Sequence, residues 1–366
     1  MRLYCPKIFL TLNIAGVIIL LFTGCIKQVS LNLRAPTPQL VVEGLLLTDS
    51  TPCKVTLSYS GIFNSVGGQV QNFINDATVF VKDGTGDSTQ LYNVGSGVYQ
   101  SASSVNAKVG GSYSLSIALS NGKRYISVPE TIVPVPQNVS LDSIGSAVYI
   151  PSGPGSGNAL NAAVINIKTQ DPADQKNYYR WIATDWIPRK ATGIQGPACA
   201  NTGQMTCFQT CFQSFEDMNI YILSDANVNG SEIRNQTVIT SPYFDYGNHY
   251  INVKQLSLTA QAFEFWELYQ QQTTRTGGIL DPLPASLVGN IYNVNDSTDV
   301  GLGYFECSDV ASFKFIFSPE FINAYNTLAN TQFYIDQGAC YLVYAPAVTN
   351  PPPGWETAPR YIVDIY

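Results

Sequence analysis

Hydrophobic and polar residues alternate along most of this chain, with turn-forming residues between the runs. The clearest run is Cys53–Ser60, where apolar residues occupy every second position, as in a strand with one buried face. Further runs are separated by Asp83–Asp87 and by the hairpin pair Asn121-Gly122. The alternation predicts short strands at 40–44, 53–60, 77–82, 88–92, 97–99, 113–119 and 123–128.

The number and spacing of these strands favour one architecture for the first region. Seven or so short strands in about 95 residues, with turns between them, are typical of an immunoglobulin-like β-sandwich. We therefore predict such a domain over residues 38–137. Pro129, Pro134 and Pro136 end it and begin a stiff connector.

The second region, residues 138–366, is less regular but also β-rich. Strands are predicted at 144–150, 162–168, 177–183, 220–223 and 250–256, and a loop of low regularity at 187–215. One helix, roughly 260–274, begins after the N-cap Thr259 and should turn Trp266 and Tyr269 toward the core. Ser318-Pro319-Glu320 is compatible with the start of a second short helix. The predicted fold is mainly β: an N-terminal immunoglobulin-like β-sandwich followed by a larger β-rich domain with one or two short helices.

The first two dozen residues depart from this alternation. Arg2 and Lys7 precede an apolar stretch that begins at Ile8, the pattern of a secretory signal peptide. This stretch of about 15 residues is shorter than the roughly 20 needed to span a bilayer. It ends in Leu21-Phe22-Thr23-Gly24-Cys25, which resembles a bacterial lipobox. We predict a signal peptide over 1–24, lipidation at Cys25 and a tether over 25–37, so that acyl chains hold the protein on a membrane.

Composition and charge limit the partners. Charged residues make up 12% of the chain, with 19 basic against 26 acidic residues. Removal of Arg2 and Lys7 with the signal leaves a formal charge of about −9. An acidic protein of this kind is not expected to bind nucleic acid or an anionic lipid surface.

Six cysteines remain in the mature chain besides Cys25. Because export places them in an oxidising compartment, all six are disulfide candidates, and they are Cys53, Cys199, Cys207, Cys211, Cys307 and Cys340. We expect a local bridge among Cys199, Cys207 and Cys211. A zinc site is the alternative for that cluster, but the only histidine of the chain, His249, is distant in sequence.

Candidate catalytic groups are scarce. A single histidine removes most acid–base schemes, and we expect His249 to be a surface or half-buried residue. Phosphate-binding, zinc-protease and dinucleotide motifs are absent from the sequence. Glu264 and Glu267, three apart on the predicted helix, form either a solvated face or the acid pair of a hydrolase. The run 293–299 is rich in oxygen ligands and is either a calcium site or a polar turn. We predict no enzymatic activity, no cofactor and no metal.

Stretches distributed over nearly the whole mature chain resemble one family. They are Cys25–Gln28, Pro38–Gly44, Gly97–Tyr99, Val109–Leu115, Pro129–Pro136, Tyr178–Trp181, Leu256–Thr259, Phe265-Trp266, Gly277–Pro282, Gly289–Ile291 and Gly301–Phe305. The family is the Bacteroidota outer-membrane lipoproteins grouped as the domain of unknown function DUF4249. The resemblance implies a lipoprotein without assigned enzymatic activity, encoded in many genomes beside TonB-dependent outer-membrane receptors.

The resemblance leads to two functional hypotheses. The first is a non-enzymatic accessory subunit of a TonB-dependent receptor or another outer-membrane β-barrel complex, in nutrient uptake or envelope assembly. The alternative is a stand-alone lipoprotein that binds glycans or peptides at the cell surface through aromatic residues of the second region. We expect a lipid-anchored outer-membrane protein on the cell surface. Ile26–Ser30 lacks the acidic residues usual after the lipidated cysteine of surface-exported lipoproteins, so the periplasmic face is the alternative.

Overall fold

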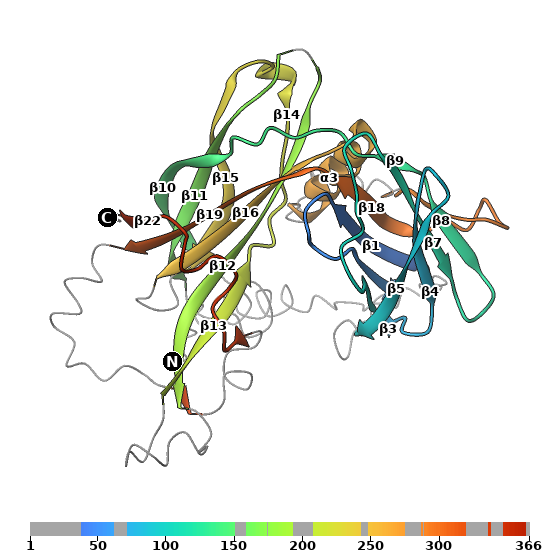
Figure 1. Ribbon diagram of the computed structural model, residues 1–366, viewed down its shortest axis with the longest axis horizontal. Helices are drawn as coiled ribbons and strands as arrows, with labels where there is room; N and C mark the ends of the chain where they lie inside the picture. Colours follow the sequence, from blue (N-terminus) through green and yellow to red (C-terminus); the bar gives the residue numbers. More distant parts are fainter. Residues whose placement is uncertain are drawn as a thin grey trace, which may run out of the picture. The chain divides into compact units, whose positions relative to one another are not determined.

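The computed structural model describes residues 38–61, 72–150, 159–173, 175–192, 208–242, 248–274, 287, 289–319, 336–337 and 347–363. This part of the chain is mainly β, as predicted, with three sheets, one α-helix and one short 3-10 helix, η1 (Asp225–Asn227) (Figure 1). The predicted signal peptide, Cys25 and the tether lie outside the described residues.

Strands of the first region and two later strands form one curved sheet, sheet A. Its strand order is β17-β8-β7-β4-β5-β6-β2-β1-β18, with β3 beside β2 and β9 beside β7. The strands are β1 (Leu40–Leu47), β2 (Lys54–Tyr59), β3 (Asn72–Phe73), β4 (Thr78–Asp83), β5 (Ser88–Gly95), β6 (Val98–Ser101), β7 (Ser112–Ala118), β8 (Arg124–Ser127), β9 (Glu130–Thr131), β17 (Ile291–Asn293) and β18 (Leu302–Ser308). Neighbouring strands are antiparallel except β1 and β18, which are parallel.

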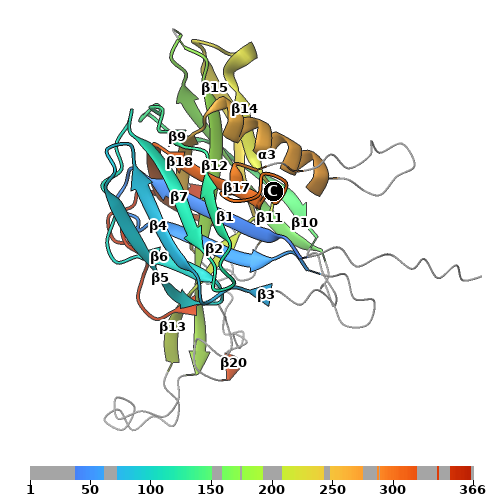
Figure 2. The ribbon, with the colours of Figure 1, turned by 90° about the vertical axis from the view of Figure 1, so that its right-hand side faces the viewer.

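The two end strands of sheet A approach each other through Asn290, the residue before β17. Its Nδ2 donates to the carbonyl oxygen of Phe305 at 2.9 Å, and its Oδ1 accepts from the Phe305 backbone N–H at 2.9 Å. The side-chain amide thus replaces a strand backbone across the gap. Figure 2 shows the strands of sheet A as one curved layer. The nearly closed sheet encloses a core of aliphatic and aromatic side chains, among them Val42, Leu57 and Leu115.

The predicted immunoglobulin-like sandwich is not confirmed. Its strands were found where the alternation placed them, but they form one hydrogen-bonded sheet instead of two facing sheets. The physical reason is β6, which pairs with β5 on one side and with β2 on the other and so joins these strands into one sheet. Beyond them, β18 pairs with β1 over seven residues, from Val41 with Leu302 to Leu47 with Ser308. β17 and β18 therefore belong to sheet A, although the predicted boundary assigned their residues to the second region. Gly303 permits this pairing, because a Cβ there would lie 2.0 Å from the Val42 carbonyl oxygen.

Two further sheets pack face to face to form a sandwich. Sheet B has the order β10-β11-β15, and sheet C the order β21-β13-β12-β16-β19-β22, with β14 and β20 also beside β12. Their strands are β10 (Ser140–Tyr149), β11 (Leu160–Gln170), β12 (Tyr178–Thr192), β13 (Phe208–Glu216), β14 (Tyr221–Ser224), β15 (Glu232–Pro242), β16 (His249–Ser257), β19 (Val310–Pro319), β20 (Asp336–Gln337), β21 (Ala347–Val348) and β22 (Arg360–Val363). Large aromatic residues, including Trp181, Phe315 and Phe317, occupy the core between these sheets.

Two predictions for the second region need correction. The loop predicted over 187–215 is shorter, because β12 continues to Thr192 and β13 begins at Phe208. Ser318 and Pro319 end β19 instead of opening a second helix. In both places pairing with distant strands decides the local structure, and the local propensities do not.

The predicted helix is present as α3 (Ala260–Thr273). Thr259 is its N-cap, with Oγ1 accepting from the Ala262 N–H at 3.2 Å. Trp266 faces the core as predicted, together with Phe265. Tyr269 was expected in the core but is 37% exposed, because three residues of helix rotate it about 60° from the direction of Trp266.

Asp309 lies between β18 and β19 and joins sheet A to sheet C. Its Oδ1 accepts from the Thr48 hydroxyl at 2.6 Å, and its Oδ2 accepts from the Val135 backbone N–H at 2.9 Å. One buried carboxylate thus holds the end of β1, the connector after β9 and the crossing between the sheets. Residues 38–366 form a single compact unit.

Candidate functional site

Alternation along β18 separates two kinds of side chain. Phe305 and Cys307 point into the core of sheet A and are almost completely buried. Tyr304 and Glu306 occupy the alternate positions and therefore face the other way. On that side Tyr304 packs with Phe265 and Trp266 of α3 in a separate apolar cluster. The carboxylate of Glu306 is thus placed where β18, β12 and α3 meet.

Glu306 is buried but electrically compensated. Its Oε2 accepts from Arg180 Nη1 of β12 at 2.7 Å and from Trp266 Nε1 of α3 at 2.6 Å. The Ser308 hydroxyl donates to Oε1 at 3.0 Å. The guanidinium of Arg180 lies 3.7 Å from the centre of the Trp266 ring, so it contributes a cation–π contact as well as an ion pair.

A second carboxylate, Glu130 of β9, extends this network. The Tyr304 hydroxyl donates to Glu130 Oε1, and the Thr259 hydroxyl donates to Oε2 at 2.8 Å. Burial raises the pKa of Glu130, and the nearby charge of Glu306 raises it further. Because Thr259 is also the N-cap of α3, Glu130 fixes the start of the helix while Glu306 fixes its middle.

We define the junction cluster as the carboxylates of Glu130 and Glu306 together with Arg180, Trp266, Tyr304 and Thr259. Acid–base hydrolysis by paired carboxyl groups requires a substrate between them. Glu130 is 2% exposed and Glu306 is 1% exposed, and their oxygens contact protein donors. In this arrangement the junction cluster fastens α3 and sheet C to sheet A.

An open hollow lies at one end of sheet A. It has a volume of about 780 Å³ and is lined by the β4–β5 turn and by the loop that precedes β7. Asp83, Asp87 and Lys108 contribute charges of both signs, and Tyr113 contributes an aromatic ring. Hydrogen bonds from Thr85 and from the backbone of the turn lower the pKa of Asp83. The volume suits a small ligand.

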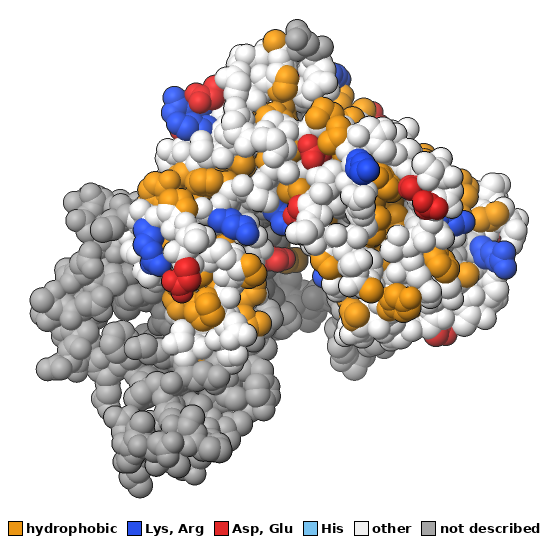
Figure 3. Space-filling model, viewed as in Figure 1, with side chains coloured by type: hydrophobic (Ala, Val, Ile, Leu, Met, Phe, Trp, Pro, Cys, Tyr) orange, Lys and Arg blue, Asp and Glu red, His pale blue; other side chains and the backbone are white. Residues whose placement is uncertain are grey.

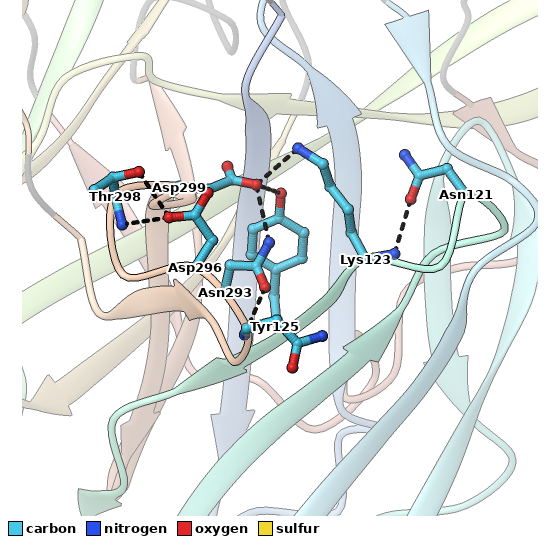
Figure 4. Close-up of polar contacts among 8 residues, drawn as sticks. Asn121, Lys123, Tyr125, Asn293, Asp296, Thr298 and Asp299 are labelled. Atoms are coloured by element: carbon cyan, nitrogen blue, oxygen red, sulfur yellow. Dashed lines mark hydrogen bonds and ion pairs between the residues drawn. The ribbon is translucent and has the colours of Figure 1, made fainter.

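The oxygen-rich run 293–299 forms a polar turn that is fastened to β8 (Figure 4). Asp299 Oδ2 accepts from Lys123 Nζ at 2.7 Å, from the Tyr125 hydroxyl at 2.9 Å and from Asn293 Nδ2 at 2.9 Å. Asp296 accepts from the backbone and the hydroxyl of Thr298. An ammonium group, a hydroxyl and an amide thus all donate to one oxygen of Asp299. In the described part of the chain, no group of three or more His, Cys, Asp or Glu side chains could hold a metal.

His249 is completely buried, which corrects the expectation of a surface or half-buried residue. It begins β16, where its Nδ1 lies 2.5 Å from Asp185 Oδ2 and its ring stacks on Phe317 at 4.8 Å. The Ser241 hydroxyl also donates to Asp185 Oδ2. Serine therefore bonds to the aspartate and not to the histidine, which is not the order of a nucleophilic triad.

Two of the disulfide candidates are free thiols. Cys53 and Cys307 are both buried and unbonded, and they lie on opposite sides of β1, since Leu46 pairs with Cys307 and Leu45 with Lys54. Two strand spacings, about 10 Å, exceed the roughly 7 Å between Cα atoms that a disulfide tolerates. Burial raises the pKa of Cys53 to about 12 and also raises that of Cys307, so both remain protonated and unreactive.

The remaining predicted site residues are four further disulfide candidates, the lipidation residue and two glutamates. Cys211 is buried on β13 and is disulfide-bonded. Cys25, Cys199, Cys207 and Cys340 lie outside the described residues, so lipidation and the local bridge remain predictions. Glu264 and Glu267 are both exposed on α3, which is the arrangement expected of a solvated helix face.

The junction cluster was missed from the sequence, although a signal for it exists. Glu306 and Arg180 are each a single charge among large apolar residues, in Tyr304-Phe305-Glu306-Cys307 and Tyr178-Tyr179-Arg180-Trp181. A charge at such a position needs an opposite charge when the strand is buried on both faces. One apolar strand carries a single acidic residue and another carries a single basic residue, so an ion pair between the two strands could have been predicted.

The model of a family described as Domain of unknown function (DUF4249) matches residues 26–314. No curated protein matches the chain. Among the residues that the structure describes, no helix is both long enough and apolar enough to cross a membrane.

Proposed function

The chain belongs to the DUF4249 family, and on that premise we propose that it is a non-enzymatic lipoprotein of the outer membrane. It is anchored through lipid on Cys25 and is an accessory subunit of an outer-membrane β-barrel complex of the TonB-dependent receptor type. Its role is in nutrient uptake or envelope assembly.

The observation that carries the proposal is the lipobox-like end of the apolar segment, Leu21–Cys25. An apolar run too short to span a bilayer, followed by a small residue and a cysteine, suits cleavage and acylation. The proposed partner comes from the resemblance to lipoproteins encoded beside such receptors. The buried carboxylates of the junction cluster support a structural role, since both are occupied by protein donors.

Co-purification tests the partner. The full chain, tagged at its C-terminus, should be recovered from mildly solubilised outer membranes together with a β-barrel protein. The Cys25→Ala variant should lose both membrane attachment and the partner. Recovery of the lipidated chain only as a free monomer would contradict the accessory role.

The hollow at the end of sheet A favours one alternative, a lipoprotein that binds glycans or peptides by itself. Polar groups of both signs together with Tyr113 match the donors and acceptors of such ligands. A ligand that binds the folded state must raise the melting temperature. Thermal-shift measurements with glycans and short peptides therefore test this alternative, with Lys108→Ala and Asp87→Ala as variants that should lose the shift.

A further inference from the structure

Two identical tripeptides are exposed on sheet A. They are Tyr92-Asn93-Val94 on β5 and Tyr292-Asn293-Val294, which ends β17. Tyr92 and Val94 are 55% and 62% exposed, and Tyr292 and Val294 are 38% and 52% exposed. Tyr92 and Val94 are two residues apart on β5 and therefore project from the same face. Val294 directly follows β17, and its backbone N–H donates to the Arg124 carbonyl oxygen at 2.9 Å.

The central asparagines also act alike. Asn93 Oδ1 accepts from the Gly95 backbone N–H at 3.0 Å, and Asn293 Oδ1 accepts from the Asn295 backbone N–H at 3.0 Å. Each asparagine thus caps the backbone two residues further on, near the end of its strand. The two copies share their sequence, the backbone contact of the asparagine and their exposure, although about 200 residues separate them.

The strand register places both copies at the same end of sheet A. β5 ends where β4 begins, and Thr78 of β4 pairs with Ala118 at the end of β7. Ala118 pairs with the start of β8, and Tyr125 of β8 pairs with Asn293. Phe73, which is 39% exposed, is also at this end, because it pairs with Ser58 near the end of β2.

The N-terminal side of the chain enters the fold at the same end. β1 begins with Leu40, which pairs with Tyr59 at the end of β2. We call this the tether end and define its apolar residues as Phe73, Tyr92, Val94, Tyr292 and Val294. Cys25 precedes Pro38 by 13 residues, which can span at most about 45 Å when fully extended. A lipid on Cys25 therefore keeps the membrane within reach of the tether end.

Charges near the tether end are close to balanced. Lys123 pairs with Asp299, and the neighbouring exposed charges are Arg124, Asp76 and Asp296. Attraction to a charged surface is thus weak, and contact must come from the apolar and aromatic side chains. Tyrosine, with an apolar ring and a polar hydroxyl, suits the membrane–water interface. Figure 3 shows hydrophobic side chains among polar ones on one face of the protein.

We propose that the tether end rests on the lipid surface, with the two Tyr-Asn-Val motifs and Phe73 at the headgroup level. This inference rests on the proposed lipid anchor and adds an orientation to it. The hollow is lined by the turn between β4 and β5 and by the segment before β7, which is the opposite end of the same strands. The hollow therefore faces away from the membrane.

The test uses the full lipidated chain on phosphatidylcholine vesicles that carry a nitroxide-labelled lipid as quencher. A fluorescent thiol label is placed on Val94→Cys and, as a matched control, on Val148→Cys of β10, since these valines are 62% and 64% exposed. The unsubstituted chain gives the background from its own cysteines. The label at position 94 should be quenched at least about twofold more than the label at 148. Tyr92→Ser with Tyr292→Ser should reduce that difference.

Flotation of the full chain and of Cys25→Ala with the same vesicles tests the anchor separately. If neither floats, the anchor and the proposed function fail, and this inference fails with them. If only the unsubstituted chain floats but positions 94 and 148 are quenched equally, the orientation is wrong and the anchor stands. The orientation would also be overturned if the label at position 94 became inaccessible to solvent only after a β-barrel protein is added, since the tether end would then be a protein interface.

Discussion

Sheet A and the sandwich of sheets B and C differ in what they bury. The core of sheet A consists of aliphatic and aromatic side chains with two thiols, and its ionisable partners lie outside it in the junction cluster. The sandwich buries Asp185 and His249 within its core region, and Asp171 in a hydrogen bond from the Tyr179 hydroxyl. A nearly closed sheet turns one face inward and can keep it apolar. Two stacked sheets with long strands leave polar positions that only hydrogen bonds can satisfy.

The largest expected effects come from emptying either core. Phe305 in sheet A and Phe315 in the sandwich are both fully buried. Phe305→Ala and Phe315→Ala should each lower the free energy of unfolding by about 3–5 kcal/mol. Because the junction cluster joins the two regions, urea denaturation followed by circular dichroism and tryptophan fluorescence should give one coincident transition for each variant. Two separate transitions would show that the regions unfold independently.

Removal of Arg180 should have the next largest effect. Arg180→Ala leaves the buried Glu306 carboxylate without its cation and should cost about 3 kcal/mol. Arg234, whose side chain is 56% exposed, also pairs with a carboxylate, that of Asp142. Arg234→Ala should therefore change stability by less than about 1 kcal/mol. If urea titrations show the same decrease in the free energy of unfolding for both variants, then burial of the junction cluster does not make its ion pair more important for stability.

The closure of sheet A depends on the amide of Asn290. Asn290→Ala leaves the N–H and the carbonyl of Phe305 without this partner and should cost about 2 kcal/mol. Amide hydrogen exchange should accelerate at β17 and β18 before the sandwich strands. Asn121→Ala, which alters an exposed turn, is the control and should leave that exchange unchanged.

The pKa of Glu130 predicts how acid affects the junction. Its pKa is raised in the folded protein, so the folded state binds more protons than the unfolded state above about pH 4.5. Glu130 therefore favours folding below its unfolded pKa, and this contribution is lost as pH rises through the folded pKa, by at most about 1.4 kcal/mol per pH unit. Glu130→Gln should flatten that part of the stability profile in urea titrations between pH 4.5 and 7.5. Parallel profiles would contradict the assignment.

The smallest effect is expected at the exposed pair Lys123–Asp299. The Lys123 side chain is 51% exposed, so Lys123→Ala should reduce stability by no more than about 0.5 kcal/mol. If the same variant binds calcium, measured by isothermal titration calorimetry, then Lys123 is what keeps the ion out of the turn at 293–299.

The sequence predicted those parts of the fold that depend on neighbours along the chain. The hairpin at Asn121-Gly122 and the helix after Thr259 were both found where predicted, since turn chemistry and capping are local. The pairing of β1 with β18 could not be read from the sequence, because each strand looks the same whichever partner it has. His249 was misplaced for the same reason: its burial comes from Asp185, Ser241 and Phe317 on three other strands.

The junction cluster lies between these cases. Its charged residues stand out in the sequence because they interrupt apolar runs. Their pairing, however, requires the fold to bring β12 and β18 together beside α3. Hydrophobic alternation predicts which face of a strand is buried and does not predict what covers it. The sequence therefore indicates that Glu306 needs a partner, and only the fold identifies Arg180.

The pairing of β1 with β18 also affects how fast this protein can fold. Leu47 and Ser308 are 261 residues apart, so sheet A stays open at β1 until β18, late in the chain, is available to pair with it. Contacts of such long sequence separation slow folding, because loop-closure entropy is lost before the contact forms. An unpaired β1 edge is meanwhile open to pairing with other chains. We therefore expect closure by β18 to limit the folding rate, and a chaperone that covers β1 to raise the folded yield without changing stability.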